Sequence, residues 1–309
     1  MRTTFIKTVV EAAERDESVF FLTGDLGFGV VEPFRNKFPS RFLNVGVAEQ
    51  NMVGIAAGLA LSGKRPIVYS IATFAVFRPF EFIRNDVCYQ NLKVVMVGAG
   101  AGFSYPQYAA THQAIDDVAA MSALPNLVIL NPGDPIETKL ATLAALNHPG
   151  PVYLRIGKKG EPNIHESEPI FEIGRAITLQ DGNDITVIAT GNILENASKA
   201  VKLLGAKGLA VRFISMPTLR PLDKELVRKA ARETRLIATV EEGFEFGGLG
   251  TAVAEVLVER TVPKTGLVKI ALPQRYPSEI GSQTYMRSVY GLTPEAIAEK
   301  VYQNFTLPL

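Results

Sequence analysis

The chain has 309 residues, enough for two domains at about 150 residues each. Hydrophobic residues make up 47% of the chain and charged residues 20%, which excludes a disordered or collagen-like protein. The 32 Lys and Arg residues nearly balance the 31 Asp and Glu residues, so the net charge of +1 gives no field that would attract a nucleic acid or an anionic membrane.

Cysteine and histidine are scarce. Cys88 is the single cysteine, which excludes an intrachain disulfide and a cysteine-rich metal site, and three histidines leave little material for a histidine-built one. The first residues include acids and lack the apolar centre of a secretory signal, and no run of about 18 apolar residues predicts a membrane span. We therefore expect a cytoplasmic protein without a nucleic acid or membrane partner.

Residues 1–160 alternate short apolar runs with segments of helical period, the pattern of parallel strands joined by crossover helices. Thr3 or Thr4 should cap a first helix that extends to about Asp16. Longer helices are expected near 47–61 and 75–89. The expected strands lie near 18–23, 43–46, 66–71, 93–98, 127–130 and 151–155. The fold class is therefore α/β, with a doubly wound, mainly parallel sheet.

Residues 161–184 are polar and rich in Gly, Pro and acids, which indicates a linker with a small strand. Residues 185–309 then repeat the alternation with shorter runs. Strands are expected at ITVIAT, LAVRFIS, LIATVE and VKIAL, and a last helix is expected from about Pro294. The sequence thus predicts a second, smaller α/β domain over 185–309.

Three segments follow expected strands, where open α/β sheets bind their ligands. LNVGVAEQ carries Glu49 in the opening turn of a helix, SIATFAVFRPFEFIR carries a run of phenylalanines, and GAGAGFSYPQYAATHQAIDD carries His112. Each has a structural interpretation as well. Glu49 suits a helix N-terminus, phenylalanines spaced by three suit a core stripe, and His112 suits a helix cap.

Together the three segments resemble a family, because their order and spacing match the C-terminal half of transketolase. The resemblance is greatest to the separate C-terminal subunit of split transketolases and covers essentially the whole chain. The matching segments are GDL at 24–26, GVAEQNMVGIAAGLALSG, ATFAVF, THQAIDDVA, LPNLVILNPGDPIE, GPVYLRIGK, MPTLRPLD and VEEG with GGLG.

The resemblance implies a thiamine diphosphate enzyme that transfers a two-carbon ketol (or acyl) unit from a ketose donor to an aldehyde acceptor. Residues 1–160 would be its pyrimidine-binding domain and 185–309 the transketolase C-terminal domain. Glu49 would hydrogen-bond the pyrimidine ring nitrogen, and His112 would contact the donor near the reacting carbon. The implied cofactor contacts are Asp25, Leu26, Glu49, Phe74, Phe77 and Phe80.

The family holds the diphosphate and its Mg²⁺ with a GDG motif and an asparagine in an N-terminal domain, and this sequence has neither in that arrangement. The resemblance therefore implies a second polypeptide that supplies the diphosphate site and the Mg²⁺ ligands, with no metal ligand on this chain. Family assembly suggests an α₂β₂ heterotetramer with a homodimer contact and with active sites at subunit interfaces.

The chain departs from the sugar-phosphate transketolases at four aligned positions. Their serine, histidine, aspartate and arginine become Gly29, Gly100, Tyr108 and Lys158 here. These changes remove much of a phosphate clamp, because a lysine does not replace a bidentate arginine. Lys158 remains a candidate substrate contact, and Arg155 is either a second one or a structural cation. We hypothesise an acceptor other than the usual aldose phosphate.

Three alternatives stay open. The β-type subunit of a 2-oxoacid dehydrogenase has the same two-domain architecture, and a deoxyxylulose-phosphate-synthase-like acyl transferase is related in chemistry. A binding module that kept the fold without the chemistry is the non-enzymatic alternative. Glu241 and Glu242, before GGLG, could form an ion site, although packing or dimerisation is the favoured use, and His165 has no partner visible in sequence.

Overall fold

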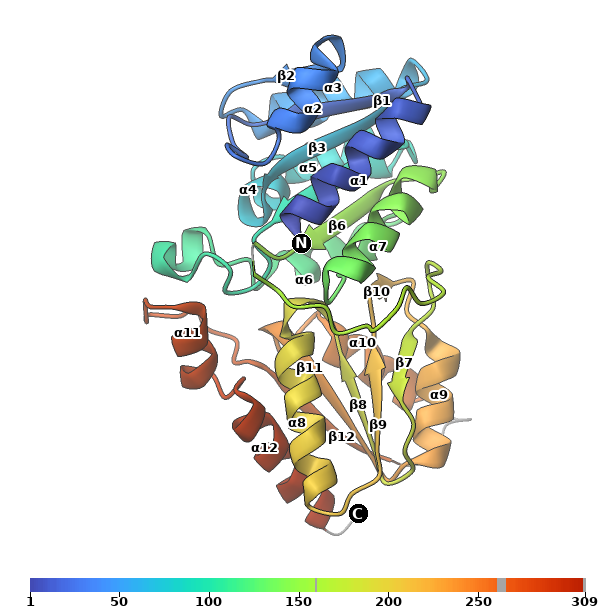
Figure 1. Cartoon of the computed structure of the whole chain (residues 1–309), viewed down its shortest axis with the longest axis vertical. Helices are drawn as coiled ribbons and strands as arrows, with labels where there is room; N and C mark the ends of the chain where they lie inside the picture. The colour runs from blue at the N-terminus through green and yellow to red at the C-terminus, as the bar shows by residue number, and fades with distance from the viewer. Residues whose placement is uncertain (159, 260–264, 308–309) are drawn as a thin grey trace.

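The computed structural model describes residues 1–158, 160–259 and 265–307. Two α/β units are stacked end to end, with the chain's N-terminus near their junction and its C-terminus at the far end of the second unit (Figure 1). The α/β fold class expected from the alternating pattern is confirmed.

The first unit contains a seven-stranded sheet in the order β10-β5-β6-β4-β3-β1-β2. Its parallel strands are β1 (Val19–Thr23), β2 (Phe42–Asn44), β3 (Arg65–Ile71), β4 (Val95–Ala99), β5 (Val128–Leu130) and β6 (Val152–Ile156). β10 (Thr218–Arg220) pairs antiparallel with β5, although it comes from the second half of the chain. This strand was not expected, because three residues are too few to carry a period.

Helices cover both faces of the first sheet, and this is why its strands are apolar on both sides. Along β1, for example, Phe21 packs on one face and Leu22 on the other. The helices are α1 (Arg2–Arg15), α2 (Glu32–Lys37), α3 (Glu49–Leu61), α4 (Ala72–Phe77), α5 (Phe80–Phe82), α6 (Asp117–Ser122) and α7 (Pro135–Asn147). α1, α2 and α7 pack on one face, and α3, α4 and α6 pack on the other.

Three local expectations were wrong. Neither Thr3 nor Thr4 caps α1, which starts after Met1 with no side-chain cap. The single helix expected over 75–89 is broken around Pro79, where α4 gives way to α5 and then to a π-helical segment, because proline lacks the backbone N–H that the ladder needs. No helix starts near Thr111, which ends a 3₁₀ segment, and α6 begins only at Asp117.

The second unit has a five-stranded sheet in the order β12-β11-β8-β9-β7. Its strands are β7 (Ile177–Gln180), β8 (Ile185–Ala189), β9 (Val211–Ser215), β11 (Leu236–Phe244) and β12 (Gly266–Leu272), with β7 antiparallel to β9. Its helices are α8 (Leu194–Ala206), α9 (Lys224–Glu233), α10 (Leu249–Leu257), α11 (Gln283–Val289) and α12 (Pro294–Thr306). α11 was not expected from the sequence.

The two units share a hydrophobic core. The cluster on the α3 side of the first sheet continues through Met216 and Leu219 into the second unit, where it includes Ile237 and Val253. The junction is therefore apolar as well as hydrogen-bonded, which favours a fixed orientation of the two units over free domain motion.

A buried group of charged side chains fastens the linker to the first unit. The Asp134 side chain caps α7 by accepting from Glu137 N at 2.7 Å, and its second oxygen accepts from Ile164 N at 2.8 Å and lies 3.1 Å from His165 Nδ1. Glu137 Oε1 lies 3.4 Å from His165 Nε2. His165, which had no visible partner in the sequence, thus lies between two carboxyl groups.

Burial sets the charge of this group. Desolvation raises the pKa of Glu137 to about 7, in spite of the hydrogen bonds it accepts. Burial alone would lower the pKa of His165, but the hydrogen bond to Asp134 and the charges of both carboxyl groups raise it. A raised pKa in the folded state means that stability falls as the pH rises, for the acid as for the base.

This group predicts a pH-dependent stability. Glu137 contributes fully below its unfolded pKa of 4.5, and its contribution is lost as the pH rises through about 7; His165 loses its own contribution above 6.5. The free energy of unfolding of the wild-type chain should therefore fall between about pH 5 and pH 8, and less steeply in Glu137→Gln. Urea unfolding at several pH values across this range measures both slopes. Glu195→Gln, in an exposed pair with Lys199, is the control, and equal slopes for wild type and Glu137→Gln would contradict the assignment.

Candidate active site

The candidate residues gather at the carboxyl ends of β1, β3 and β4. Glu49 is the first residue of α3, and Ser70 lies near the end of β3. Gly24, which follows β1, lies so close that a β-carbon there would be 3.4 Å from Glu49 Oε1. Three segments that are far apart in sequence thus meet at one carboxyl group.

The Glu49 side chain is buried, with 2% of the residue exposed. Ser70 Oγ donates to Oε1 at 3.1 Å. Arg78 Nη1 donates to Oε1 at 3.0 Å and to Oε2 at 2.8 Å. The N-terminus of α3 adds a favourable dipole for a negative group. Arg78 was not among the residues that the sequence singled out, because no spacing relates it to Glu49.

Aromatic side chains form the wall beside Glu49. The Arg78 guanidinium lies over the Phe74 ring, with Cζ 3.8 Å from the ring centroid, and the His112 ring meets Phe74 edge-on at 4.9 Å. Phe77 follows one turn later and is half exposed. Phe80 lies beyond the helix break and packs against the core instead.

An open cleft of about 410 Å³ lies beside this wall. Its lining residues are Thr73, Phe74, Phe77, Arg78, Ala110, Thr111, Asp116 and Tyr276. Tyr276 comes from the second unit, and its hydroxyl donates to Asp116 Oδ2 at 3.0 Å. Both units therefore build the cleft, a contribution of the second unit that the sequence did not indicate.

The turn after β1 is held by Asn44. Asp25 has a left-handed backbone with φ of 57°, its N–H donates to Asn44 Oδ1 at 2.9 Å, and Asn44 Nδ2 donates back to Asp25 Oδ1 at 2.9 Å. Aspartate tolerates this conformation better than most side chains. Leu26 is half buried, and its carbonyl accepts from Thr23 Oγ1 at 2.8 Å. The turn is thus fixed in place beside Glu49.

His112 lies among aromatic rings at the rim. Its Nδ1 is 2.8 Å from Thr111 Oγ1, and its ring centroid is 4.8 Å from that of Tyr108. Desolvation lowers the pKa of His112, and the nearby Arg78 charge lowers it further. The neutral imidazole is therefore favoured, with one nitrogen to donate and one to accept.

The departures from the sugar-phosphate pattern lie mostly around the same histidine. Gly100 has φ of 93°, and a β-carbon there would overlap the ring of Tyr105. Lys158 Nζ lies 4.7 Å from the centroid of that ring. Tyr108 is exposed beside His112, whereas Gly29 lies in an exposed turn where a β-carbon would meet nothing. The glycine at position 100 therefore makes room for a tyrosine.

Family profiles match nearly the whole chain. The profile described as "Transketolase, pyrimidine binding domain" matches residues 1–161, and the one described as "Transketolase, C-terminal domain" matches residues 174–297. The chain belongs to the transketolase family. The resemblance noted in the sequence is thereby confirmed.

Individual transketolase relatives agree over most of their length. One of the two subunits of an apulose-4-phosphate transketolase from Phocaeicola vulgatus is 38% identical over 85% of this chain and 85% of its own. A 6-deoxy-6-sulfo-D-fructose transketolase subunit from Clostridium sp. is 32% identical over 98% of this chain and 94% of its own. A solved structure described as "Split gene transketolase, inactive beta4 tetramer" has a TM-score of 0.89 and 37% identity, and covers 99% of this chain and 98% of its own.

A longer relative also matches. The 1-deoxy-D-xylulose-5-phosphate synthase of Desulforudis audaxviator is 34% identical over 95% of this chain, which spans 46% of that protein. The homologues are thus named transferring enzymes, and those of similar length are named as subunits of transketolases. This transketolase chain is accordingly an enzyme subunit of the split, two-subunit type.

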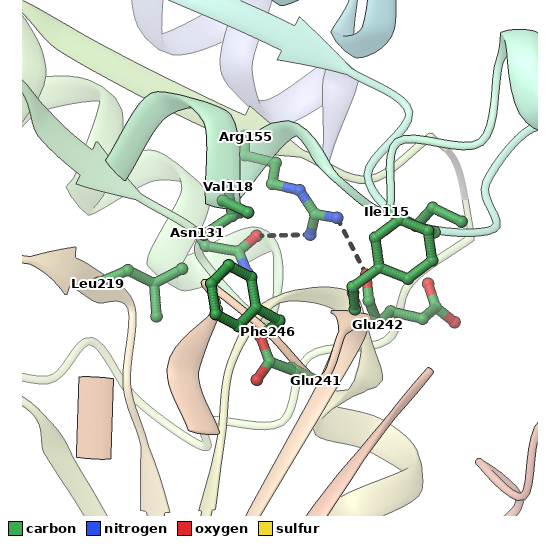
Figure 2. Close-up of a pocket in the computed structure, with 12 residues that line it drawn as sticks. Ile115, Val118, Asn131, Arg155, Leu219, Glu241, Glu242 and Phe246 are labelled. Atoms are coloured by element: carbon green, nitrogen blue, oxygen red, sulfur yellow. Dashed lines mark hydrogen bonds between the residues drawn. The ribbon is translucent and has the colours of Figure 1, made fainter. Parts of the chain in front are cut away.

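Arg155 of this transketolase subunit is a buried cation at the junction of the two units. Its Nε donates to Asp117 Oδ2 at 2.8 Å, and its Nη2 donates to the carbonyls of Ala114 and Glu242. Figure 2 shows it above Glu242 with Asn131 beside it. The space that these residues line is about 10 Å³, the size of one water molecule. Of its two interpretations, the geometry matches the structural cation, and we leave Arg155 out of the substrate site.

Glu241 and Glu242 are used in packing. Glu241 caps α10 by accepting from Leu249 N and Gly250 N, each at 2.8 Å. Glu242 pairs with Arg287 and accepts from Phe103 N at 3.1 Å. Both carboxyl groups are therefore occupied within the chain, as the packing interpretation expected.

The described residues hold neither a metal-binding cluster nor a membrane helix. Over 1–158, 160–259 and 265–307, no three His, Cys, Asp or Glu side chains gather in a way that could hold a metal ion. Within the same ranges, no helix is long and apolar enough to cross a membrane.

The Arg155 network predicts a large loss of stability in Arg155→Met. Removing the guanidinium leaves the buried Asp117 carboxylate without its cation, which typically costs about 3–5 kcal/mol of the free energy of unfolding. Urea unfolding of the full chain measures the loss. Lys199→Met, in an exposed pair with Glu195, is the control and should change little. A loss in Arg155→Met as small as in the control would show that the network is not needed.

Proposed function

We propose that this chain is the pyrimidine-binding subunit of a cytoplasmic, thiamine-diphosphate-dependent transketolase. The enzyme would transfer a two-carbon ketol unit from a ketose donor to an aldehyde acceptor. The observation that carries the proposal is the buried Glu49 carboxyl group beside the Phe74 ring, with His112 on the rim of the same open cleft.

These residues fit the pyrimidine half of the cofactor. A buried carboxyl group can hydrogen-bond a ring nitrogen, and the Phe74 face can stack on a flat ring, with Phe77 beside it. When bound, the cofactor supplies a carbon nucleophile and an electron sink for the ketol fragment. The chain's part is to orient the ring through Glu49 and to exclude water with the aromatic wall.

His112 is placed to act on the donor. As a neutral imidazole at the cleft rim, it can donate a hydrogen bond to a donor oxygen or accept one from a donor hydroxyl. Asp25 and Leu26 support the cofactor side of the site through the turn that Asn44 fixes. We do not assign Phe80 to the cofactor wall, because it packs in the core.

An apolar surface beside the site supports a partner subunit. Phe28 is 75% exposed after the β1 turn, Val47 is 68% exposed before α3, and Phe77 is 42% exposed at the cleft. Large exposed apolar side chains on neighbouring segments are typical of an interface. We propose that an N-terminal-type subunit covers this surface and brings the diphosphate and Mg²⁺ ligands, in an α₂β₂ assembly.

The acceptor is proposed to differ from the usual aldose phosphate. At the rim, Tyr105 fills the space above Gly100, Tyr108 lies beside His112, and Lys158 faces Tyr105. None of these side chains offers the planar fork with which arginine binds a phosphate. The names of the split-type relatives, which refer to apulose-4-phosphate and 6-deoxy-6-sulfo-D-fructose, support sugars other than the common ones.

A second candidate is acyl transfer of the 1-deoxy-D-xylulose-5-phosphate synthase type. The 34% identity to such a synthase favours it. Glu49 and the aromatic wall would serve it equally, since both reactions use the same cofactor. A pyruvate donor in place of a ketose separates the two candidates in one assay.

Cofactor binding should depend on the partner. We expect the chain alone to bind thiamine diphosphate and Mg²⁺ weakly, and the assembled complex to bind them tightly, by calorimetric titration. Glu49→Gln in the complex should abolish ylid formation, measured as exchange of the thiazolium proton for deuterium. Glu81→Gln, on exposed α5, should leave the exchange unchanged. Tight binding by the chain alone would contradict the split site.

Acceptor choice should depend little on phosphate. With a common ketose donor, the complex should show a kcat/KM for ribose 5-phosphate within about tenfold of that for ribose, because a tenfold preference corresponds to about 1.4 kcal/mol and a phosphate clamp supplies more. Lys158→Ala should lower both values by a similar factor. Efficient turnover that strongly prefers ribose 5-phosphate would refute the acceptor hypothesis.

A further inference from the structure

Arg78 makes two contacts that stand out among the cleft residues. Nη1 donates to both oxygens of Glu49, at 3.0 and 2.8 Å, and Cζ lies 3.8 Å from the centroid of the Phe74 ring. Within the described chain, Glu49 is the only residue to which its guanidinium donates a hydrogen bond. The group is planar, so one face lies on the aromatic ring while one edge meets the carboxylate.

The same two contacts are those that the proposed function asks of an aminopyrimidine. A flat nitrogen heterocycle would hydrogen-bond Glu49 through a ring edge and stack on Phe74 through its face. At 3.8 Å the guanidinium already takes the stacking distance above Phe74. The guanidinium and a pyrimidine cannot use the same carboxyl edge and the same ring face together.

We propose that Arg78 stands in for the aminopyrimidine while the subunit is unassembled and must leave Glu49 and Phe74 before the cofactor can enter. The inference rests on the proposed function of Glu49. It makes Arg78 a positioning residue, because it satisfies a buried carboxylate that would otherwise lack a cation.

The surroundings of Arg78 allow this movement. It follows the last residue of α4 and precedes Pro79, so its backbone belongs to a helix end next to a break. Its side chain is 41% exposed, and it lines the open cleft of about 410 Å³. By contrast, the Arg155 side chain is 2% exposed and donates to four groups. A cation held only for stability resembles Arg155, not Arg78.

The test uses the full chain without its partner and a small probe, 4-amino-5-hydroxymethyl-2-methylpyrimidine. Arg78→Met removes the charge and the plane but keeps an apolar stem. We expect it to bind the probe at least about tenfold more tightly than wild type by calorimetry, the factor given by removing one competing charge-assisted hydrogen bond. Arg84→Met changes an exposed arginine six positions on, which bonds only Asn85 among the described residues, and should match wild type. Adding Glu49→Ala to Arg78→Met should remove the gain.

Two further measurements keep the inference testable if Arg78→Met does not fold. Arg78→Lys keeps a charge but cannot stack as a plane, and should bind the probe more tightly than wild type. In a structure of the assembled wild-type complex with thiamine diphosphate, the Arg78 guanidinium should be clear of both Glu49 oxygens. Retention of that contact, or equal probe binding by wild type, Arg78→Met and Arg78→Lys, would overturn the inference.

The outcomes also separate the inference from the proposed function. If the complex binds thiamine diphosphate through Glu49 while no Arg78 variant binds the probe better, the substitute role of Arg78 is wrong and the function stands. If the complex binds no thiamine diphosphate, the proposed function itself fails.

Discussion

A carboxyl group buried at the edge of a sheet needs a partner, and the site of this protein is organised around that need at Glu49. Desolvating a carboxylate costs more free energy than most single contacts return. The chain meets the cost with the α3 N-terminus, the Ser70 hydroxyl and the Arg78 guanidinium. The Phe74 ring then supplies the apolar wall that keeps water away. The polar edge and the aromatic face together define what can bind there.

The second unit takes part in the site through the junction, not through residues of its own at Glu49. β10 extends the first sheet, Arg155 joins Asp117 to carbonyl groups of both units, and the core runs across the boundary. This fixed packing brings Tyr276 to the rim of the cleft, where it meets Asp116. Rigid docking of the two units is thus a condition for the shape of the substrate side.

Much of the architecture was predictable because it depends on local periodicity. The strands β1 to β6 and α3 lie where apolar runs and a small-residue helix were expected, and the family followed from ordered segments around Glu49 and His112. The failures have local causes. Pro79 interrupts the helix that carries the phenylalanines, so Phe80 leaves the wall that Phe74 and Phe77 share.

The sequence by itself determined the α/β class, the family and the residue types at the site, because these depend on spacing along the chain. Only the tertiary structure decided which cation meets Glu49, what Arg155 is for and where His165 goes. Those pairings join positions 29, 38 and 31 residues apart, and no period links such positions. The choice among many charged residues is made by which of them the folded sheet buries together, where an unpaired charge costs most.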